Sequence, residues 1–140
     1  MYFDTAYIAK FYLNEPESER IRTLVAEAGS VYSSSWAMAE FHTVVVRHFR
    51  EGRLAQNRME FVAARFDYDL AVGLWQLTPV TSSVLRQTAN FLLSAPRLLI
   101  RAGDAVHLTT AFMLGEREVW TNDRHMTLAA PSFHLTARSL

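Results

Sequence analysis

The chain of 140 residues has no cysteine, a single lysine (Lys10) and a net charge of zero. The lack of cysteine excludes disulfide bonds, thiolate metal sites and a cysteine nucleophile, and it fits a cytoplasmic protein. A net charge of zero argues against binding of nucleic acid by overall electrostatic attraction, but it leaves room for a local basic rim. No apolar run is long enough to cross a bilayer, and the N-terminus does not resemble a signal peptide.

The residues that are present indicate one folded domain over positions 1–140. Half of them are hydrophobic and a fifth are charged, which is typical of a globular domain with a substantial core. Apolar runs bounded by turn residues predict strands at 1–3, 31–33, 74–80 and 118–123, with a candidate fifth at 133–137. Helical spacing of apolar residues predicts helices at 5–13, 16–29, 33–52, 53–72, 81–93 and 102–115.

Short strands that alternate with helices predict an α/β fold in which a parallel sheet is covered on both faces. In such folds, binding sites lie outside the carboxyl ends of the strands. Asp4 and Asp123 follow predicted strands, and Asp104 begins a predicted helix. Each of these three, taken alone, is best interpreted as a helix N-cap, because aspartate is a favoured cap and the helix dipole stabilises its charge.

Glu40 is too far into its predicted helix to cap it. Its helical neighbours include Trp36 and Val44, so its face is mostly apolar, and a rim glutamate or a functional acid explains it equally well. If Asp4, Glu40, Asp104 and Asp123 met at one edge of the sheet, their charges would repel one another and raise some of their pKa values. A divalent cation relieves such repulsion, and ligation by oxygen alone selects Mg²⁺ or Mn²⁺.

Four segments in this order resemble the PIN-domain family, and in particular the VapC toxins of bacterial toxin–antitoxin pairs. They are FDTAYIAKFYLNEPES, SSSWAMAEFHTVVVR, RAGDAVHLTTAF and VWTNDRHM, and they cover almost the whole chain. The resemblance implies a PIN-like three-layer α/β/α sandwich with a central, short-stranded parallel sheet. It also implies an Mg²⁺-dependent endoribonuclease, with Mn²⁺ as an alternative ion, that acts on RNA and has a cognate antitoxin and a homodimeric state.

The resemblance also assigns roles to individual residues. The four metal-binding acids of the family correspond to Asp4, Glu40, Asp104 and Asp123, and two supporting hydroxyl groups correspond to Thr5 and Thr121. The chain departs from the family pattern at three positions, where Ala6 replaces a frequent serine or asparagine, Gly103 replaces a larger apolar residue and Asn122 replaces an occasional acid. None of these departures removes a ligand. The implied antitoxin would lie between the first helices and the long helix pair, where one of its basic side chains could mask the acids.

The candidate substrate contacts rest on position in the sequence. Arg101 and Arg124 flank Asp104 and Asp123 closely, and Arg47, Arg50 and Arg97 are further candidates to surround the site. His107 lies one turn after Asp104 on the same helix face, where a structural hydrogen bond is favoured over a contact to substrate. The aromatic residues Tyr7, Phe11, Tyr12 and Trp36 are predicted to belong to the core.

Two other classes of function remain open at this point. A receiver or phosphotransfer domain also uses an acidic pocket with Mg²⁺, but it needs two adjacent early acids and a late lysine, which this sequence lacks. A catalytically silent PIN-like module that only binds a partner would not need all four acids. For the proposed nuclease, Asp4 and Asp104 would mainly hold the ion, while Asp123 and Glu40 would hold a second ion or position the attacking water.

Overall fold

The computed structural model describes residues 1–140, in which five strands alternate with helices. The elements are β1 (Tyr2–Phe3), α1 (Thr5–Tyr12), α2 (Ser18–Ala28), β2 (Val31–Ser34), α3 (Trp36–Arg50), α4 (Gln56–Ala71), β3 (Trp75–Thr78), α5 (Ser82–Ser94), α6 (Ala102–Met113), β4 (Glu118–Trp120), α7 (Arg124–Ala129), a short 3₁₀ helix (Ala130–Phe133) and β5 (Thr136–Arg138). No helix is long and apolar enough to span a membrane.

The strands form one parallel sheet in the order β3-β2-β1-β4-β5. The chain therefore winds outward from β1 in one direction through β2 and β3, and in the other direction through β4 and β5. The gap between the carboxyl ends of β1 and β4 is the switch point of this topology, which is where open α/β sheets bind their ligands.

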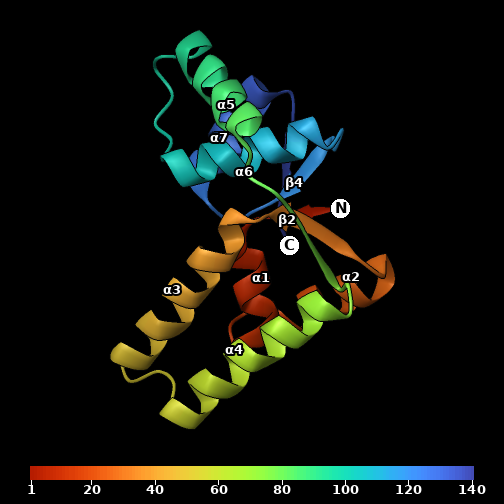
Figure 1. The fold of residues 1–140 in the computed structure, drawn as a ribbon, viewed down its shortest axis with the longest axis vertical. Helices are drawn as coiled ribbons and strands as arrows, with labels where there is room; N and C mark the ends of the chain where they lie inside the picture. The colour runs from red at the N-terminus through yellow and green to blue at the C-terminus, as the bar shows by residue number, and fades with distance from the viewer.

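The two faces of the sheet are covered by different helices, which makes the domain the predicted three-layer sandwich. Helices α1 to α4 lie on one side of the sheet and α5 to α7 on the other (Figure 1). Side chains alternate between faces along a strand, so the adjacent residues Tyr2 and Phe3 enter different cores. Phe3 packs with Tyr7, Phe41 and other residues of the first side, whereas Tyr2 packs with residues of α6 and of the C-terminal segment.

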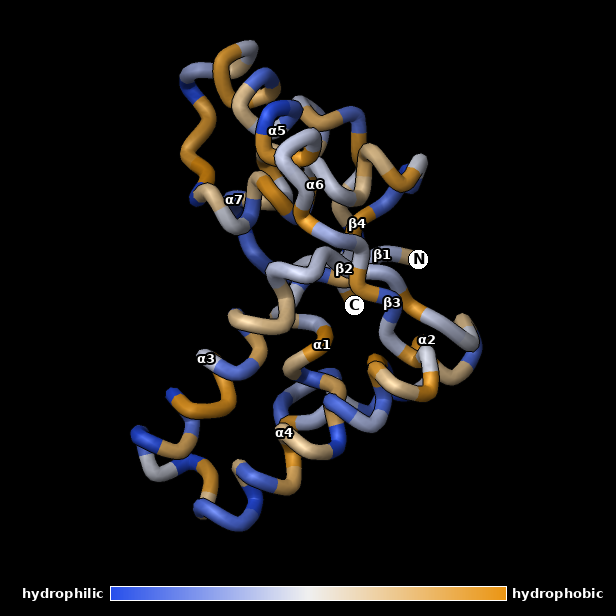
Figure 2. The backbone as a smooth tube through the Cα atoms, viewed as in Figure 1, coloured by the Kyte–Doolittle hydropathy of each residue, from blue (hydrophilic) through white to orange (hydrophobic).

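Helices α3 and α4 form a hairpin that extends away from the sheet (Figure 1). Hydrophobic and hydrophilic residues alternate along both helices, as expected when one face packs and the other meets solvent (Figure 2). Inside this hairpin, Phe41 stacks on Phe66 with ring centroids 4.1 Å apart. The base of the hairpin thereby fixes the start of α3, which carries Glu40, against the sheet.

The predicted elements agree with the structure except at a few boundaries. Pro16 was expected in the first turn of its helix, but α2 begins at Ser18, after a turn in which Glu17 adopts a left-handed backbone with φ of 75°. The Ser18 hydroxyl holds this turn by donating to the carbonyl of Leu13 and accepting from the Glu15 amide. Ser33 was expected to end the second strand, and β2 includes it; Ser34 was expected in the long helix but also belongs to β2, because it pairs with β3.

The C-terminal segment differs most from expectation. Residues 124–129 form α7, which was not predicted, and β5 begins three residues later than the expected strand at 133–137. A six-residue helix is too short to show a helical period in the sequence. The register of β5 depends on pairing with β4, which is a tertiary effect.

Candidate active site

Asp4 and Asp123 leave the neighbouring strands β1 and β4 and each caps the helix that follows. The Asp4 carboxylate accepts a hydrogen bond of 2.9 Å from the Tyr7 amide, and the Asp123 carboxylate accepts from the amides of His125 and Met126. The N-cap interpretation of these two acids is therefore correct. In each case the bonded oxygen is Oδ1, and Oδ2 receives no hydrogen bond within these caps.

Asp104 is not an N-cap, contrary to the simplest reading of the sequence. Arg101 occupies the N-cap position of α6 without a capping hydrogen bond from its side chain, and Asp104 lies in the first turn. Its Oδ2 atom is buried and has no hydrogen-bond partner, which is the single such side-chain atom in the protein. Burial, followed by the negative charge of Asp123, raises the pKa of Asp104. An unpaired, buried carboxylate oxygen is costly in a folded protein and marks a position where a cation would be stabilised.

Burial likewise raises the pKa of Asp4, against the opposing effects of the Thr121 hydroxyl and the Tyr7 amide. Thr121 also accepts a hydrogen bond of 3.0 Å from the Asp123 amide, so it ties the exit of β4 to the site. Asp4 and Asp104 thus both have a raised pKa, and an added positive charge would stabilise their ionised forms.

Glu40 differs from the three aspartates because three donors surround it. Thr5 Oγ1 donates to Oε2 at 2.5 Å, His107 Nε2 lies 2.9 Å from the same oxygen, and Trp36 Nε1 donates to Oε1 at 3.1 Å. Burial acts to raise the pKa of Glu40, but the hydrogen bonds from His107 and Thr5 outweigh it and hold the pKa below its usual range. Glu40 is therefore a pre-oriented carboxylate rather than a rim glutamate.

His107 is the buried support of this arrangement. Its side chain is almost fully inaccessible, and its Nδ1 lies 3.0 Å from the hydroxyl of Tyr2. The ring consequently connects Tyr2 in β1 to Glu40 in α3. This geometry matches the favoured interpretation of His107 as a structural hydrogen-bond partner, although the buried imidazole also lines the acidic cavity beside Glu40.

All four acids line one open cavity of about 590 Å³. Two cationic side chains from the sequence prediction share it, namely Arg47 on α3 and Arg101 before α6. The Arg101 guanidinium lies 3.7 Å from Asp104 and 3.8 Å from Asp123, although its side chain is 80% exposed. Arg101 thus partly offsets the negative charge of the aspartates and is free to move.

The donor set fits a hard divalent ion by chemistry, since it is made of carboxylates and includes an orphaned buried oxygen. As the side chains stand, however, no three Asp, Glu or His residues are placed to hold one ion together. Glu40 is drawn toward its three donors, and Arg101 occupies the space between Asp104 and Asp123. Binding of an ion by Asp4, Asp104 and Asp123 would therefore require these side chains to adjust.

The structure does not bring every predicted contact residue to this cavity. Arg124 and Arg97 line a different pocket, together with the exposed residues Leu99 and Leu128, and Arg50 lies near the far end of α3. Arg124 was predicted to lie near the acids because it follows Asp123 in the sequence. It is the first residue of α7, however, and its side chain lines the other pocket. Of the five arginines, only Arg47 and Arg101 line the acidic cavity.

Comparisons with known proteins agree with this geometry. The sequence profile of the PIN domain matches residues 1–130. The chain belongs to the PIN domain family. No curated protein matches the chain by sequence, but solved structures share the fold of this PIN domain.

Three solved structures illustrate that likeness. The Mycobacterium tuberculosis toxin VapC20, which cleaves the sarcin–ricin loop, is 16% identical with a TM-score of 0.70, over 91% of this chain and 93% of its own. FitAcB from Neisseria gonorrhoeae is 18% identical with a TM-score of 0.71, over 97% and 94% of the two chains. FitAB bound to an IR36 DNA fragment is 20% identical with a TM-score of 0.72, over 99% and 93%.

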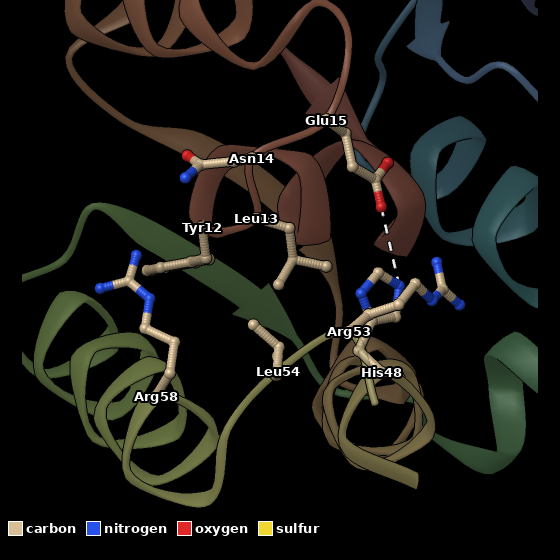
Figure 3. A pocket seen from close by; sticks show the side chains of 8 residues that line it. All are labelled: Tyr12, Leu13, Asn14, Glu15, His48, Arg53, Leu54 and Arg58. Atoms are coloured by element: carbon tan, nitrogen blue, oxygen red, sulfur yellow. Dashed lines mark ion pairs between the residues drawn. The ribbon is translucent and has the colours of Figure 1, made fainter. Parts of the chain in front are cut away.

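The PIN domain has a second, smaller pocket of about 300 Å³ between the turn after α1 and the turn that joins α3 to α4. In Figure 3, Glu15 and His48 face each other across it, with 3.7 Å between Oε1 and Nε2, while Arg53 and Arg58 stand at its sides. Burial, reinforced by the nearby charge of Arg53, lowers the pKa of His48. With a single acid and two arginines, this pocket cannot hold a cation and is distinct from the acidic cavity.

Sequence reasoning missed the roles of two residues, one that lines the acidic cavity and one that packs against its lining. Trp36 was expected in the core, but 46% of its surface is exposed and it lines the cavity. Gly103 was noted only as a departure from the family pattern, whereas its α carbon lies against Trp36 and Glu40. The i, i+4 spacing of Trp36 and Glu40 was the one signal in the sequence that could have indicated their contact.

Proposed function

We propose that this protein is a divalent-metal-dependent endoribonuclease and the toxin of a toxin–antitoxin pair. The observation that carries the proposal is the convergence of Asp4, Glu40, Asp104 and Asp123 on one cavity in which an Asp104 oxygen is buried without a partner. The resemblance to VapC toxins supports RNA as the substrate. VapC20, a structural neighbour, is itself a toxin that cleaves an RNA loop.

Different residues of the cavity are suited to metal binding, to orientation of the attacking water and to phosphate binding. Asp4, Asp104 and Asp123 would hold Mg²⁺ or Mn²⁺, and the ion would supply a charge that polarises the phosphate and lowers the pKa of bound water. Glu40 is kept ionised and oriented by Thr5 and His107, so it can accept a hydrogen bond from the attacking water. Arg47 and Arg101 can bind phosphate oxygens at the edge of the cavity.

The receiver-like alternative has lost its support. Receiver-like sheets have the strand order 2-1-3-4-5, whereas this sheet has the order 3-2-1-4-5. The residue after Asp4 is a threonine, and Lys10, the single lysine, bonds to Glu17 outside the acidic cavity. The catalytically silent PIN module remains the competing hypothesis.

The decisive experiment is cleavage of a labelled single-stranded RNA in Mg²⁺ or Mn²⁺, with EDTA as the first control. Asp4→Asn should keep the cap on α1, because asparagine caps helices as well as aspartate, but should lose at least about a hundredfold in cleavage rate. Asp67→Asn is the matched control, since Asp67 is an exposed acid on α4 and should cleave normally. Normal cleavage by Asp4→Asn, or none by the wild-type protein in either ion, would refute the proposed nuclease.

The proposed toxin role, antitoxin partner and homodimeric state need separate tests. Expression of the wild-type protein without its antitoxin should arrest bacterial growth, whereas Asp4→Asn should not. The pocket of Figure 3 lies between the first helices and the α3–α4 pair, where the resemblance to VapC places the antitoxin. The mass of the purified protein in solution would distinguish a dimer from a monomer.

A further inference from the structure

Trp36 combines an exposed aromatic face with a fixed edge. It lies in the first turn of α3, 46% of its surface is exposed, and it lines the same cavity as the four acids. Its indole Nε1 donates to Oε1 of Glu40 at 3.1 Å. A large, flat and apolar surface is thereby held directly beside the carboxylates, which is unusual because an indole that serves only packing would be buried.

Gly103 provides the space that this arrangement needs. A Cβ atom at position 103 would lie 2.8 Å from Nε1 of Trp36 and 2.9 Å from Oε1 of Glu40, which is closer than nonbonded atoms approach. The backbone of Gly103 is not left-handed, unlike that of the glycines that end helices in this protein. It lies in the first turn of α6, where glycine has a lower helix propensity than alanine and the helix does not require it. The absent side chain therefore serves contact between Trp36 and Glu40 rather than backbone conformation.

The surroundings of the indole match the parts of a nucleotide. Arg47 and Arg101 on the same cavity are suited to phosphate, and the acids are suited to a divalent cation. The remaining part of a nucleotide is its base, which proteins commonly bind by stacking it on an exposed aromatic side chain. Charge of both signs around one aromatic face thus favours a nucleotide over an apolar peptide.

We propose that Trp36 is a substrate-binding residue on which a nucleobase next to the cleaved phosphate stacks, and that Gly103 is a positioning residue that keeps the indole in place. This inference rests on the proposed ribonuclease function and names its substrate class. Bases inside an A-form duplex already stack on each other, so the base must come from a single strand or a loop.

The first test compares Trp36→Ala with Trp36→Phe. In the Asp4→Asn background, where RNA is not cut, Trp36→Ala should weaken binding of a single-stranded oligoribonucleotide by about tenfold to a hundredfold. Trp36→Phe keeps an aromatic face and should stay within about threefold of its parent. With Asp4 intact, Trp36→Ala should raise KM more than it lowers kcat. Phe61→Ala is the matched control, because Phe61 is 56% exposed on α4 outside the cavity.

Gly103→Ala tests the positioning role. The added methyl group should displace the indole and weaken RNA binding by about tenfold, while the melting temperature should not fall, because alanine favours the helix. Fluorescence gives a direct readout, since Trp36 is the one exposed tryptophan of the three, while Trp75 is buried and Trp120 is partly buried outside the acidic cavity. Single-stranded RNA should quench the emission of the wild-type protein, duplex RNA should not, and Trp36→Phe should abolish the quenching.

The outcomes separate this inference from the proposed function. If the wild-type protein binds and cleaves RNA but Trp36→Ala binds it equally well, the stacking proposal is wrong and the nuclease proposal stands. If Trp36→Ala keeps its affinity for RNA and instead loses affinity for the antitoxin, the indole is a protein-docking residue and the proposal is again wrong. Normal RNA binding by Gly103→Ala would overturn the role of Gly103. A wild-type protein that neither binds nor cleaves RNA refutes the proposed function itself.

Discussion

Two inward-facing aspartates of this protein, Asp69 and Asp104, are held in opposite ways. Asp69 in α4 is almost fully buried and both of its oxygens are paired, because the Tyr12 hydroxyl donates to it at 2.7 Å and Arg65 Nε lies within 3.1 Å of each oxygen. Asp104 in α6 has a buried oxygen with no hydrogen-bond partner. Asp69 thus has hydrogen bonds to both of its oxygens within the core, whereas Asp104 has an oxygen without a hydrogen bond at the carboxyl end of the sheet.

This difference separates a structural acid from a functional one. A paired buried carboxylate stabilises the fold that surrounds it, and its removal leaves partners such as Tyr12 without an acceptor. The Asp104 carboxylate has a buried oxygen without a hydrogen bond and lies beside Asp123, and its ion pair with the exposed Arg101 only partly offsets the resulting cost in free energy. A cation would recover that free energy on binding. Substitution of the two acids should therefore change stability in opposite directions.

The larger effect is expected at Asp69. Asp69→Ala removes the acceptor of the Tyr12 hydroxyl, which also accepts a hydrogen bond from Trp75 in the same core. We expect a loss of about 1–3 kcal/mol in the free energy of unfolding, measured by urea denaturation, because a buried hydroxyl donor is left unpaired. RNA cleavage by the folded fraction should be unchanged.

Two further variants sharpen that measurement. Asp67→Ala alters an exposed acid on the same helix and should stay within about 0.5 kcal/mol of the wild type. The double variant Tyr12→Phe/Asp69→Ala should lose less free energy of unfolding than the sum of the two single variants, because both substitutions remove the same hydrogen bond. An unchanged unfolding midpoint for Asp69→Ala would contradict its structural role.

A smaller effect of opposite sign is expected at Asp104 in EDTA. Burial and the charge of Asp123 raise its pKa, so its ionised form is less stable in the folded state than in the unfolded one. Asp104→Asn removes this cost, and its melting temperature at pH 7 should exceed that of the wild type by about 2–4 °C. Mn²⁺ should raise the melting temperature of the wild type but not of the variant. A lower melting temperature for Asp104→Asn in EDTA would show that the acid stabilises the apo fold.

The same contrast explains which parts of the site could be predicted from sequence. Asp4 and Asp123 were found because an apolar strand ends directly before Asp4 and another ends three residues before Asp123, and strand ends are local features of the sequence. The partners of Glu40 could not be found, because Thr5 and His107 reach it from elements 35 and 67 residues away. Which acid has an orphaned oxygen depends on the packing of α6 against its neighbours, and sequence spacing contains no information about it.

The fold shows the same division between local and tertiary causes. Helices with a long apolar period, such as α3, were predicted to within a few residues, and Gly29 and Gly115 end their helices with a left-handed backbone as expected. Helix α7 and the bounds of β5 were missed, since one is set by the Asp123 cap and the other by pairing with β4. Position in sequence also failed for Arg124, which lines a different pocket from Asp123.

The smallest expected effect concerns His48, a buried base that can be compared with the two aspartates. His48 is buried, and its one charged partner, Glu15, lies at 3.7 Å, beyond hydrogen-bond distance. Its pKa is lowered by burial, so the folded protein binds fewer protons than the unfolded chain near the usual histidine pKa of about 6.5. Stability should therefore be full above about pH 6.5 and fall as the pH drops through the lowered pKa of the folded state.

His48→Gln removes this proton uptake and should flatten the fall in melting temperature between about pH 7 and pH 5. His125→Gln is the matched control, because His125 is exposed at the start of α7 and should leave the pH profile unchanged. RNA cleavage at pH 7 should be unaffected by either change, since neither histidine lines the acidic cavity. A pH profile that His48→Gln leaves as steep as before would mean that Glu15 compensates for the burial of the imidazole. The pocket of Figure 3 would then resemble the paired environment of Asp69 more than the unpaired one of Asp104.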